Sequence, residues 1–245
     1  MNSIDRRTIR KYKQQPLPQD TLEFILNSGI RASNCGNMQL YSIIVTQEEE
    51  NKKRLAPLHF NQPMVENASV VLTVCLDVNR FNHWCRINSA DESLNNFLFL
   101  NIATIDATIC TQAMASAAEE KGLGICYLGT VNYMAKEIAQ ALNLPKGVIP
   151  VTTLTIGYPN ENPALTERLP MQALVHYEKY KDYTDEDIKN IYKDIEENPV
   201  NKAFVKENNL DNLAQVFSQV RYSKKDAEQF SKLYKEFVKE TFCEL

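Results

Sequence analysis

The sequence opens with three arginines, Arg6, Arg7 and Arg10, set within five positions. If residues 4–12 form a helix, spacings of three and four residues let the three guanidinium groups gather on one side. Their mutual repulsion would be relieved by one shared dianion such as a phosphate monoester, to which each guanidinium donates paired hydrogen bonds. A solvated cluster beside Asp5, an arm for nucleic acid and a targeting signal are the alternatives that this segment leaves open.

A second group of polar side chains lies in the segment RASNCGNMQLYSIIV, residues 31–45, where a helix ends and an apolar strand begins. The hydroxyl and carboxamide groups there both donate and accept hydrogen bonds, as the edge of a polar heterocycle or a ribityl chain requires. The candidate residues are Ser33, Asn34, Asn37 and Gln39. The alternative is a polar connector without a ligand.

The sequence contains no GxSxG, HExxH or GxxxxGK[ST] motif that would indicate a hydrolase, a zinc protease or a phosphate-binding loop. Its 7 glycines cluster once, in GLGICYLG (122–129), without the GxGxxG spacing of a dinucleotide-binding turn. These absences favour a cofactor that carries its own reactivity and needs only binding and orientation. We therefore predict no catalytic acid or base and no metal site.

Composition weakens the alternatives for the arginines. The chain has 27 basic and 31 acidic residues, a net charge of -4 and a pI of about 5.5, so no overall field draws it to nucleic acid or an anionic membrane. The six cysteines are scattered without a CxxC pair, which favours reduced thiols packed in a core. The opening MNSIDRR has no apolar signal region. We expect a cytoplasmic protein in which His59 and His83 lie in loops and Trp84 packs against its neighbours.

The pattern of apolar residues predicts the strands and helices that could position these side chains. Four strand-length apolar runs, each apolar on both faces, predict strands covered by helices on two sides. The runs are residues 40–46, 69–76, 124–129 and 151–158, with helices predicted at 19–31 and 135–144. The expected fold is a three-layer arrangement of the α+β or α/β class.

The longest apolar stretch, residues 98–118, has one charge, Asp106, at its middle. A bilayer would penalise that charge by about 2.5–3.5 kcal/mol, so a buried helix is the better interpretation. Beginning near Asp91 or Ser93 and stopping at Gly122, the helix would span about 28 residues and about 42 Å. A helix this long and apolar on all sides is expected in a core or a subunit interface.

The last third of the sequence differs from the rest in composition. Residues 159–183 read as an extended arm rich in proline, charge and tyrosine, and helices are predicted from Thr184 onward with a linker at 197–212. We predict a core with its arm over residues 1–180 and a helical cap over 181–245.

Together these segments resemble the nitroreductase superfamily, in particular the branch of type A oxygen-insensitive NADPH nitroreductases and NADPH-flavin oxidoreductases. The opening pattern of that family matches Arg6, Arg7, Thr8, Arg10 and Tyr12, and its polar loop matches Ser33, Asn34, Asn37 and Gln39. Further matches are HFNQPMVENASVVLTVCLDVNR, GLGICYLGTV, NLPKGVIPVTTLTIGYP, LTERLP and, more loosely, QVRYSKKD. Departures are Thr166, where a second lysine is usual, and Cys35 and Gly36 in the loop.

The resemblance implies a nitroreductase-like fold with a central mixed sheet flanked by helices, and an intertwined homodimer with the long helix at its interface. It implies FMN with the phosphate on Arg6, Arg10 and Arg168, and with Arg7 and Thr8 along the ring and ribityl chain. The partner would contribute Ser33, Asn34 and Asn37, and Gln39 belongs to the same cofactor-binding set. Gln62 and the loop of Tyr127, Leu128, Gly129 and Thr130 would flank the ring near N5, while Arg221 and Lys224 would meet the nicotinamide dinucleotide.

The implied reaction is a ping-pong transfer of hydride from NADPH, or NADH, through FMN to a small aromatic acceptor: a nitroaromatic, a quinone or a flavin. Alternatives are a flavin-binding module or sensor without turnover, a dehalogenating or flavin-degrading relative, and a nucleic-acid-binding arm.

Overall fold

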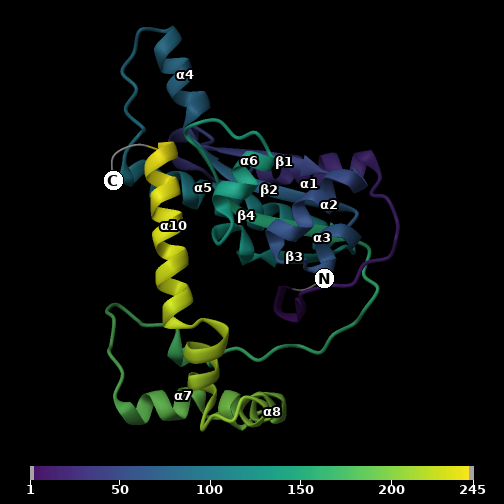
Figure 1. Ribbon diagram of the computed structural model, residues 1–245, viewed down its shortest axis with the longest axis vertical. Coiled ribbons are helices and arrows are strands. Elements are labelled where there is room, and N and C mark those ends of the chain that lie inside the picture. The colour runs from purple at the N-terminus through teal and green to yellow at the C-terminus, as the bar shows by residue number, and fades with distance from the viewer. Residues whose placement is uncertain (1–2, 243–245) are drawn as a thin grey trace. The chain divides into compact units, whose positions relative to one another are not determined.

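The protein is described here from a computed structural model that covers residues 3–242. The chain forms two compact units: a first unit of Met1–Ala164 with Lys232–Leu245, and a second unit of Leu165–Ser231. The first unit contains α1 (Gln19–Ile30), β1 (Tyr41–Thr46), α2 (Glu49–Leu55), α3 (Pro63–Asn67), β2 (Val70–Asp77), α4 (Asn79–Ile87), α5 (Phe97–Glu120), β3 (Gly124–Leu128), α6 (Ala135–Ala141) and β4 (Val148–Gly157) (Figure 1). The second contains α7 (Asp185–Glu197), α8 (Pro199–Glu207) and α9 (Leu213–Gln215), and α10 (Lys224–Phe242) begins there and ends in the first.

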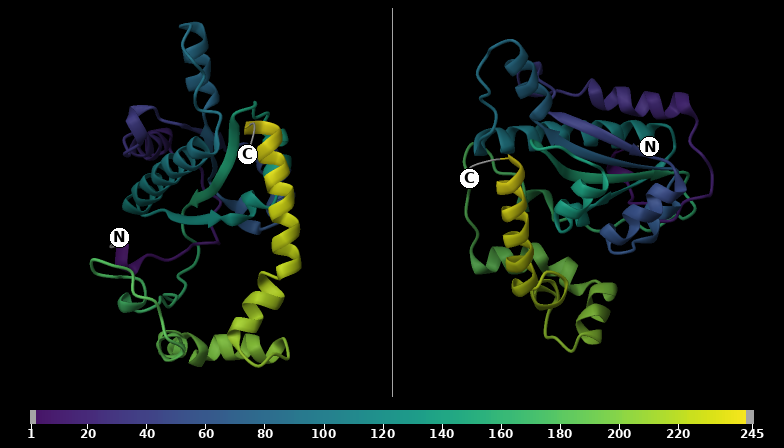
Figure 2. Two further views of the ribbon diagram at one scale, coloured as in Figure 1. Left: turned by 90° about the vertical axis from the view of Figure 1, so that its left-hand side faces the viewer. Right: turned by 45° about the horizontal axis from the view of Figure 1, so that its top comes forward.

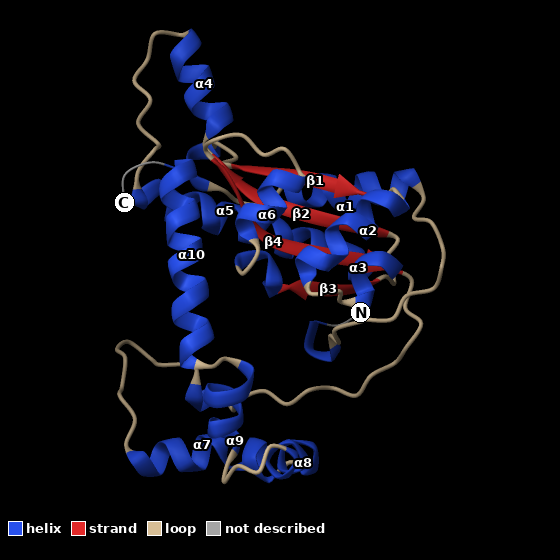
Figure 3. Cartoon of the chain, viewed as in Figure 1, coloured by secondary structure: helices blue, strands red, loops and turns tan. Residues whose placement is uncertain are grey.

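The four predicted strands form one sheet with the order β1-β2-β4-β3 (Figure 3). This confirms the α+β class, but every strand pair in the described part of the chain is antiparallel, so the predicted mixed sheet is wrong in that respect. The reason lies in the connections: the segment around α6 starts and ends at the same end of the sheet, so β4 runs back along β3. A helix between two strands therefore does not by itself make them parallel.

Helices cover both faces of the sheet, which explains strands that are apolar on both sides. Leu72 and Val74 on β2 pack with α1 and α5 in one buried cluster, and these two helices lie on one side of the sheet (Figure 2). Val71, which points the other way along β2, packs with Leu55 of α2 and Val65 of α3. The alternation with period two thus assigns one side of each strand to each helical layer.

Helix α5 confirms the predicted long helix, with a later start. The side chain of Asn96 caps it by accepting a hydrogen bond from Phe99 N at 3.1 Å, so α5 begins at Phe97 and not near Asp91. At its other end Gly122 has a φ of 75° and stops the helix, as predicted. By length and composition α5 could cross a membrane, but it packs on α1 and on the sheet as a core helix, with Asp106 only 2% exposed.

Residues 6–12 are not helical, which corrects the first helix of the sequence analysis; a single 3₁₀ turn, Ser3–Asp5, precedes them. The segment runs along the outer edge of β3, where Ile9 N donates to Ile125 O at 3.0 Å. Further on, Tyr12 forms a bridge with Pro159, and Lys13 N donates to Tyr158 O at 2.9 Å. The edge strand offers backbone groups that need partners, and burial of Ile9 and Tyr12 adds to the pairing.

We expect Gly124→Ala to detach this segment in part. A Cβ atom at Gly124 would lie 2.6 Å from Ile9 Cβ, an atom next to the backbone that cannot swing aside. The expected loss is about 1–3 kcal/mol in the free energy of unfolding, typical of overpacking, measured by urea denaturation. Gly129→Ala is the control, because a Cβ there meets nothing within 4 Å; equal stability of the two variants would contradict the expectation.

The predicted loop positions of His59 and His83 need correction, whereas the packing of Trp84 on a neighbour is confirmed. His59 is not a loop residue but ends the 3₁₀ helix Ala56–His59 and is 0% exposed, and His83 lies in α4, which the sequence analysis did not predict. Trp84 on α4 packs edge-to-face on Phe81 with ring centroids 5.5 Å apart, yet it stays 60% exposed within this chain. The cysteines 75, 85, 110 and 126 are buried as expected, Cys35 is exposed, and Cys243 lies outside the described residues.

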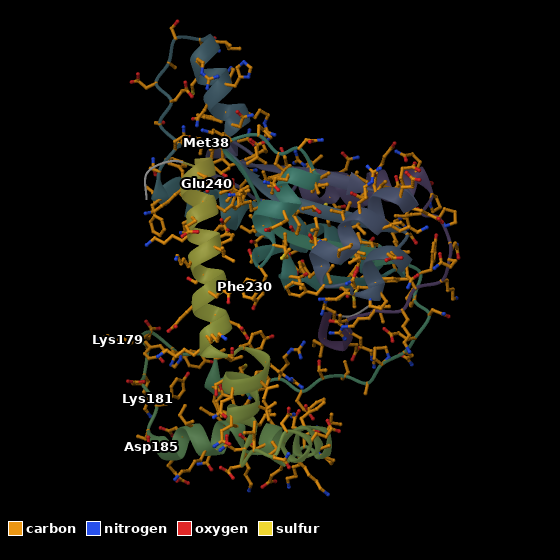
Figure 4. All side chains as sticks on the ribbon, viewed as in Figure 1. Met38, Lys179, Lys181, Asp185, Phe230 and Glu240 are labelled. Atoms are coloured by element: carbon orange, nitrogen blue, oxygen red, sulfur yellow. The ribbon has the colours of Figure 1, made fainter. Side chains whose placement is uncertain are left out.

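The end of α10 belongs to the first unit. Phe237, Val238 and Phe242 pack in a buried cluster with Leu40, against which Met38 also packs. Glu240, labelled with Met38 in Figure 4, forms an ion pair with Lys136 at 2.7 Å. The apolar side chains at the end of α10 therefore fix this helix to the first unit.

The second unit is helical, as predicted from Thr184 onward. Thr184 and Asp187 form a capping box at the start of α7. The predicted linker at 197–212 is wrong, because it contains α8: Asn198 caps that helix, and Pro199 occupies its first position. Proline interrupts a helix in its interior but is favoured at its first position. The predicted functional division at residue 180 has other boundaries than the compact units and stays a prediction.

Candidate functional site

The three N-terminal arginines lie along the outer edge of β3, each with a different anchor. Arg6 Nε forms an ion pair with Glu119 Oε1 of α5 at 3.3 Å. Arg7 donates from one terminal nitrogen to Asp5 O at 3.1 Å. The backbone N–H of Arg10 donates to the Glu161 carboxylate at 2.5 Å. The edge of β3 therefore holds in an extended conformation the arginine segment that the sequence analysis placed on a helix.

One hydrogen-bond donor in this arginine segment has no partner. Arg7 Nε is buried and has no hydrogen-bond partner, although a buried guanidinium N–H without an acceptor is costly. Burial raises the pKa of the Glu119 carboxyl, and the nearby Arg6 acts in the opposite direction. An acceptor of hydrogen bonds beside Arg7 would satisfy the buried N–H, which suits an anionic or heterocyclic ligand.

Residues 127–130 form the end of β3 and the start of the 3₁₀ turn that follows it. The Tyr127 hydroxyl donates to Gln112 Oε1 at 3.2 Å, and burial raises the pKa of Tyr127 to about 12. Leu128 and Thr130 are buried, whereas Gly129 between them is exposed. A Cβ on Gly129 would meet no protein atom within 4 Å, so open space adjoins the backbone there.

Gln62 lies at the end of a short left-handed turn. Phe60 and Asn61 have φ values of 56° and 53°, a conformation that costs non-glycine residues about 1–2 kcal/mol each. The turn is tied to the loop at Thr130, because His59 Nδ1 and Thr130 Oγ1 share a hydrogen bond of 2.8 Å. The structure therefore links Gln62 and Thr130 through His59, which the sequence analysis expected in a loop without a role.

The loop 33–39 is built from its own carboxamides. Asn34 Oδ1 accepts from Gln39 N at 3.2 Å, and Gln39 Nε2 donates to Asn37 Oδ1 at 2.8 Å. The loop is attached to α5 through Cys35 N, which donates to Asp106 Oδ1 at 2.9 Å. Ser33 at the start of the loop is exposed. The charge at the middle of the apolar helix thus serves as the anchor of this loop.

The loop and the arginines are held at different points of the same helix. Asp106 anchors the loop and Glu119 pairs with Arg6, and their separation of 13 positions corresponds to about 20 Å along α5. Within one chain the loop and the arginine segment are therefore attached to α5 at separate points. The sequence analysis expected the loop residues to reach the cofactor from a partner subunit, and this remains a prediction.

The remaining candidates belong to the second unit. Arg168 donates to Thr166 Oγ1 at 2.9 Å, so the threonine that replaces a usual lysine orients the arginine. The Arg221 guanidinium lies over the rings of Phe204 and Phe217, at 4.6 and 5.2 Å from their centroids. Lys224 is exposed and pairs with Glu228 at 3.9 Å.

A family model corroborates what the residues indicate: the description "Nitroreductase family" matches residues 4–158. The chain belongs to the nitroreductase family. Within residues 3–242 no three His, Cys, Asp or Glu side chains gather to hold a metal ion.

Individual relatives of this nitroreductase-family chain match over most of its length. It is 32% identical over 185 residues to "FMN reductase (NADPH)" of Bacillus subtilis (strain 168), covering 75% of this chain and 74% of that protein. It is 30% identical to "NADPH-flavin oxidoreductase" of Vibrio harveyi, covering 76% and 75%. A crystal structure from Bacteroides fragilis NCTC 9343 has 45% identity and a TM-score of 0.97 and covers 100% of both chains.

Three residues that hold the candidate site together were given no role in the sequence analysis. Glu119 and Glu161 hold the arginine segment, and His59 joins two loops. Their partners are far away in the sequence, so no local spacing marks them. For His59 the local signals are its place at the start of the matched stretch HFNQPMV and before the left-handed residues Phe60 and Asn61, and neither shows its partner Thr130.

Proposed function

We propose that this protein transfers hydride from NADPH or NADH by way of bound FMN to a flavin, a quinone or a nitroaromatic compound, in two successive half-reactions. As a member of the nitroreductase family it is an NAD(P)H-dependent oxidoreductase with FMN as its cofactor. The identity of the acceptor and the order of the half-reactions go beyond the family assignment and are the proposal.

The single observation that carries the proposal is the arginine segment paired with β3, the strand that leads to the open backbone at Gly129, with Arg7 Nε buried and unpartnered. These residues fit a ligand with a dianionic end and a ring that accepts hydrogen bonds. Arg6 and Arg10, with Arg168, would hold the FMN phosphate, and Arg7 and Thr8 would lie along the ribityl chain and ring. When bound, FMN supplies a ring that takes up a hydride and gives it to the acceptor.

The chain's own residues would bind and orient; none is proposed as an acid or base. Gln62 and residues 127–130 would flank the ring, and the cations of residues 6–10 would stabilise negative charge that develops on the reduced cofactor. Ser33, Asn34, Asn37 and Gln39 would complete the site from a second copy. Arg221 and Lys224 would meet the dinucleotide, and the two phenylalanines under Arg221 would preorganise its guanidinium.

A homodimer is part of the proposal. Helix α5 leaves apolar side chains uncovered within one chain: Phe97, Leu98, Ile105 and Ile109 are 40–68% exposed. Large exposed apolar side chains on one helix favour a subunit interface. We propose that a second copy covers them and that the protein works as a soluble homodimer in the cytoplasm, apart from nucleic acid and membranes. Light scattering on the purified protein tests the oligomeric state.

The purified protein tests the function directly. We expect visible absorbance of oxidised flavin at about one FMN per chain, bleaching by NADPH or NADH without oxygen, and recovery of colour when a quinone or nitroaromatic is added. A protein that keeps its colour with both dinucleotides would be a flavin-binding module without turnover. A colourless protein that does not take up added FMN would overturn the proposed function.

Gly129→Ala tests the open backbone beside the ring. The added Cβ meets no protein atom within 4 Å, so the free energy of unfolding should change by less than about 1 kcal/mol. The same Cβ would crowd a ring bound beside this backbone. We expect FMN affinity to fall about fivefold, the low end of overpacking costs, measured by quenching of flavin fluorescence. Unchanged affinity with unchanged stability would argue that the ring lies elsewhere.

A further inference from the structure

His59 is a buried titratable residue to which the proposed reaction assigns no role. It is 0% exposed, its Nδ1 lies 2.8 Å from Thr130 Oγ1, and its Nε2 is buried without a partner. Thr130 follows the exposed Gly129 and is itself 9% exposed, so this residue lies where the buried interior meets the open backbone of the candidate site.

The same residue holds the turn that carries Gln62. His59 O accepts from Gln62 N at 3.2 Å, and the left-handed residues Phe60 and Asn61 lie between them. The ring of Phe60 also packs edge-to-face on Tyr133, with centroids 6.1 Å apart. One imidazole thus connects the two loops that are expected to flank the flavin ring, at Gln62 and at Thr130.

The unpartnered nitrogen decides which way the hydrogen bond runs. If the proton were on Nε2, a buried N–H would have no acceptor, which proteins almost always avoid; a bare nitrogen lone pair is tolerated more often. With the proton on Nδ1, the imidazole donates to Thr130 Oγ1. The hydrogen of the Thr130 hydroxyl is then not used by His59 and can be donated elsewhere.

We propose that neutral His59, with its proton on Nδ1, is a positioning residue that turns the Thr130 hydroxyl so that its hydrogen is donated to a nitrogen or oxygen of the bound flavin ring. His59 would also hold Gln62 and Thr130 at a constant separation. This inference rests on the proposed function, because it assigns the role of His59 toward the same cofactor.

Substitutions at the two positions test the inference. His59→Leu and Thr130→Val each remove the bond, and each should weaken FMN binding about tenfold, within the range of one buried hydrogen bond. Because both act through one hydroxyl, the double variant should also lose about tenfold and not about a hundredfold. Thr130→Ser keeps the hydroxyl and should stay within about threefold of the unchanged protein.

A matched pair at position 59 separates this role from simple filling of the core. In His59→Asn the amide nitrogen can occupy the place of Nδ1, whereas in His59→Gln it occupies the place of Nε2. We expect the asparagine variant to recover FMN affinity to within about threefold, and the glutamine variant to resemble leucine. Equal affinities for the asparagine and glutamine variants, or additive losses in the double variant, would overturn the inference.

The tautomer gives a readout that needs no bound cofactor. In ¹⁵N NMR of the protein at neutral pH, His59 should show a protonated Nδ1 and an unprotonated Nε2. A proton on Nε2 would overturn the inference, because Thr130 would then have to donate its hydrogen to His59.

Failure of the inference is distinguishable from failure of the proposed function. A protein that binds FMN and bleaches with NADPH, but whose variants behave additively, retains the function and loses the role of His59. A protein that never takes up FMN loses both, whatever tautomer His59 adopts.

Discussion

Replacing Arg10 by alanine is expected to weaken FMN binding by roughly 10- to 100-fold, because a hydrogen bond between two charged groups contributes about 1.5–3 kcal/mol. The backbone N–H of Arg10 is held by Glu161, and that bond does not depend on the side chain. The N-terminal segment should therefore stay on β3, so that the loss reports on the guanidinium. Fluorescence titration of the apoprotein with FMN measures the change.

Two further variants make the Arg10 result interpretable. Arg54→Ala removes an exposed arginine of α2 that is not among the candidate cofactor-binding residues, and it should leave FMN affinity unchanged. Arg10→Lys retains the charge without the paired donors and should give an intermediate loss. FMN binding that tolerates Arg10→Ala as well as Arg54→Ala would remove Arg10 from the phosphate site.

Acidification should destabilise the protein through His59. Burial lowers the pKa of His59 from its ordinary 6.5 to about 4 in the folded protein. Between these values the unfolded chain binds a proton that the folded chain does not, so stability falls as pH decreases through this window. From pH 7 to pH 4.5 the expected loss from this one residue is about 2–3 kcal/mol, at 1.36 kcal/mol for each unit of difference in pKa.

Urea denaturation at both pH values measures the loss, and His59→Asn isolates the contribution of the imidazole. Asparagine does not titrate, so the variant should lose about 2–3 kcal/mol less over the same interval, although it is less stable at pH 7. If the variant and the unchanged protein lose stability in parallel, His59 is not the group that titrates.

The sheet and its helices could be predicted because their signals are local. The run SVVLTVCL is β-branched and apolar on both sides, which suits a strand under two helical layers, and β2 occupies Val70–Asp77. Gly122 marked the end of α5 correctly, because left-handed backbone at a helix end favours glycine. The close spacing of Arg6, Arg7 and Arg10 likewise marked them in the sequence as one group.

The failures share a different cause, since they depend on partners distant in the sequence. The spacing of Arg6 and Arg10 suits a helix, but the free edge of β3 draws the segment into extended pairing at Ile9. Asp106 was recognised as an unusual charge, yet its role as the anchor of Cys35 required the packed structure. For His59, burial and the bond to Thr130 are tertiary properties that no spacing encodes.

The two anchors on α5 constrain how the length of this protein can vary. Asp106 and Glu119 are fixed to one continuous helix, so deleting a residue between them would rotate Glu119 by about 100° and shift it by about 1.5 Å relative to Asp106. Such a deletion would carry the carboxylate off the helix face that meets Arg6. Substitutions between these anchors should be tolerated where they preserve packing, but changes in length should be confined to the loops outside α5.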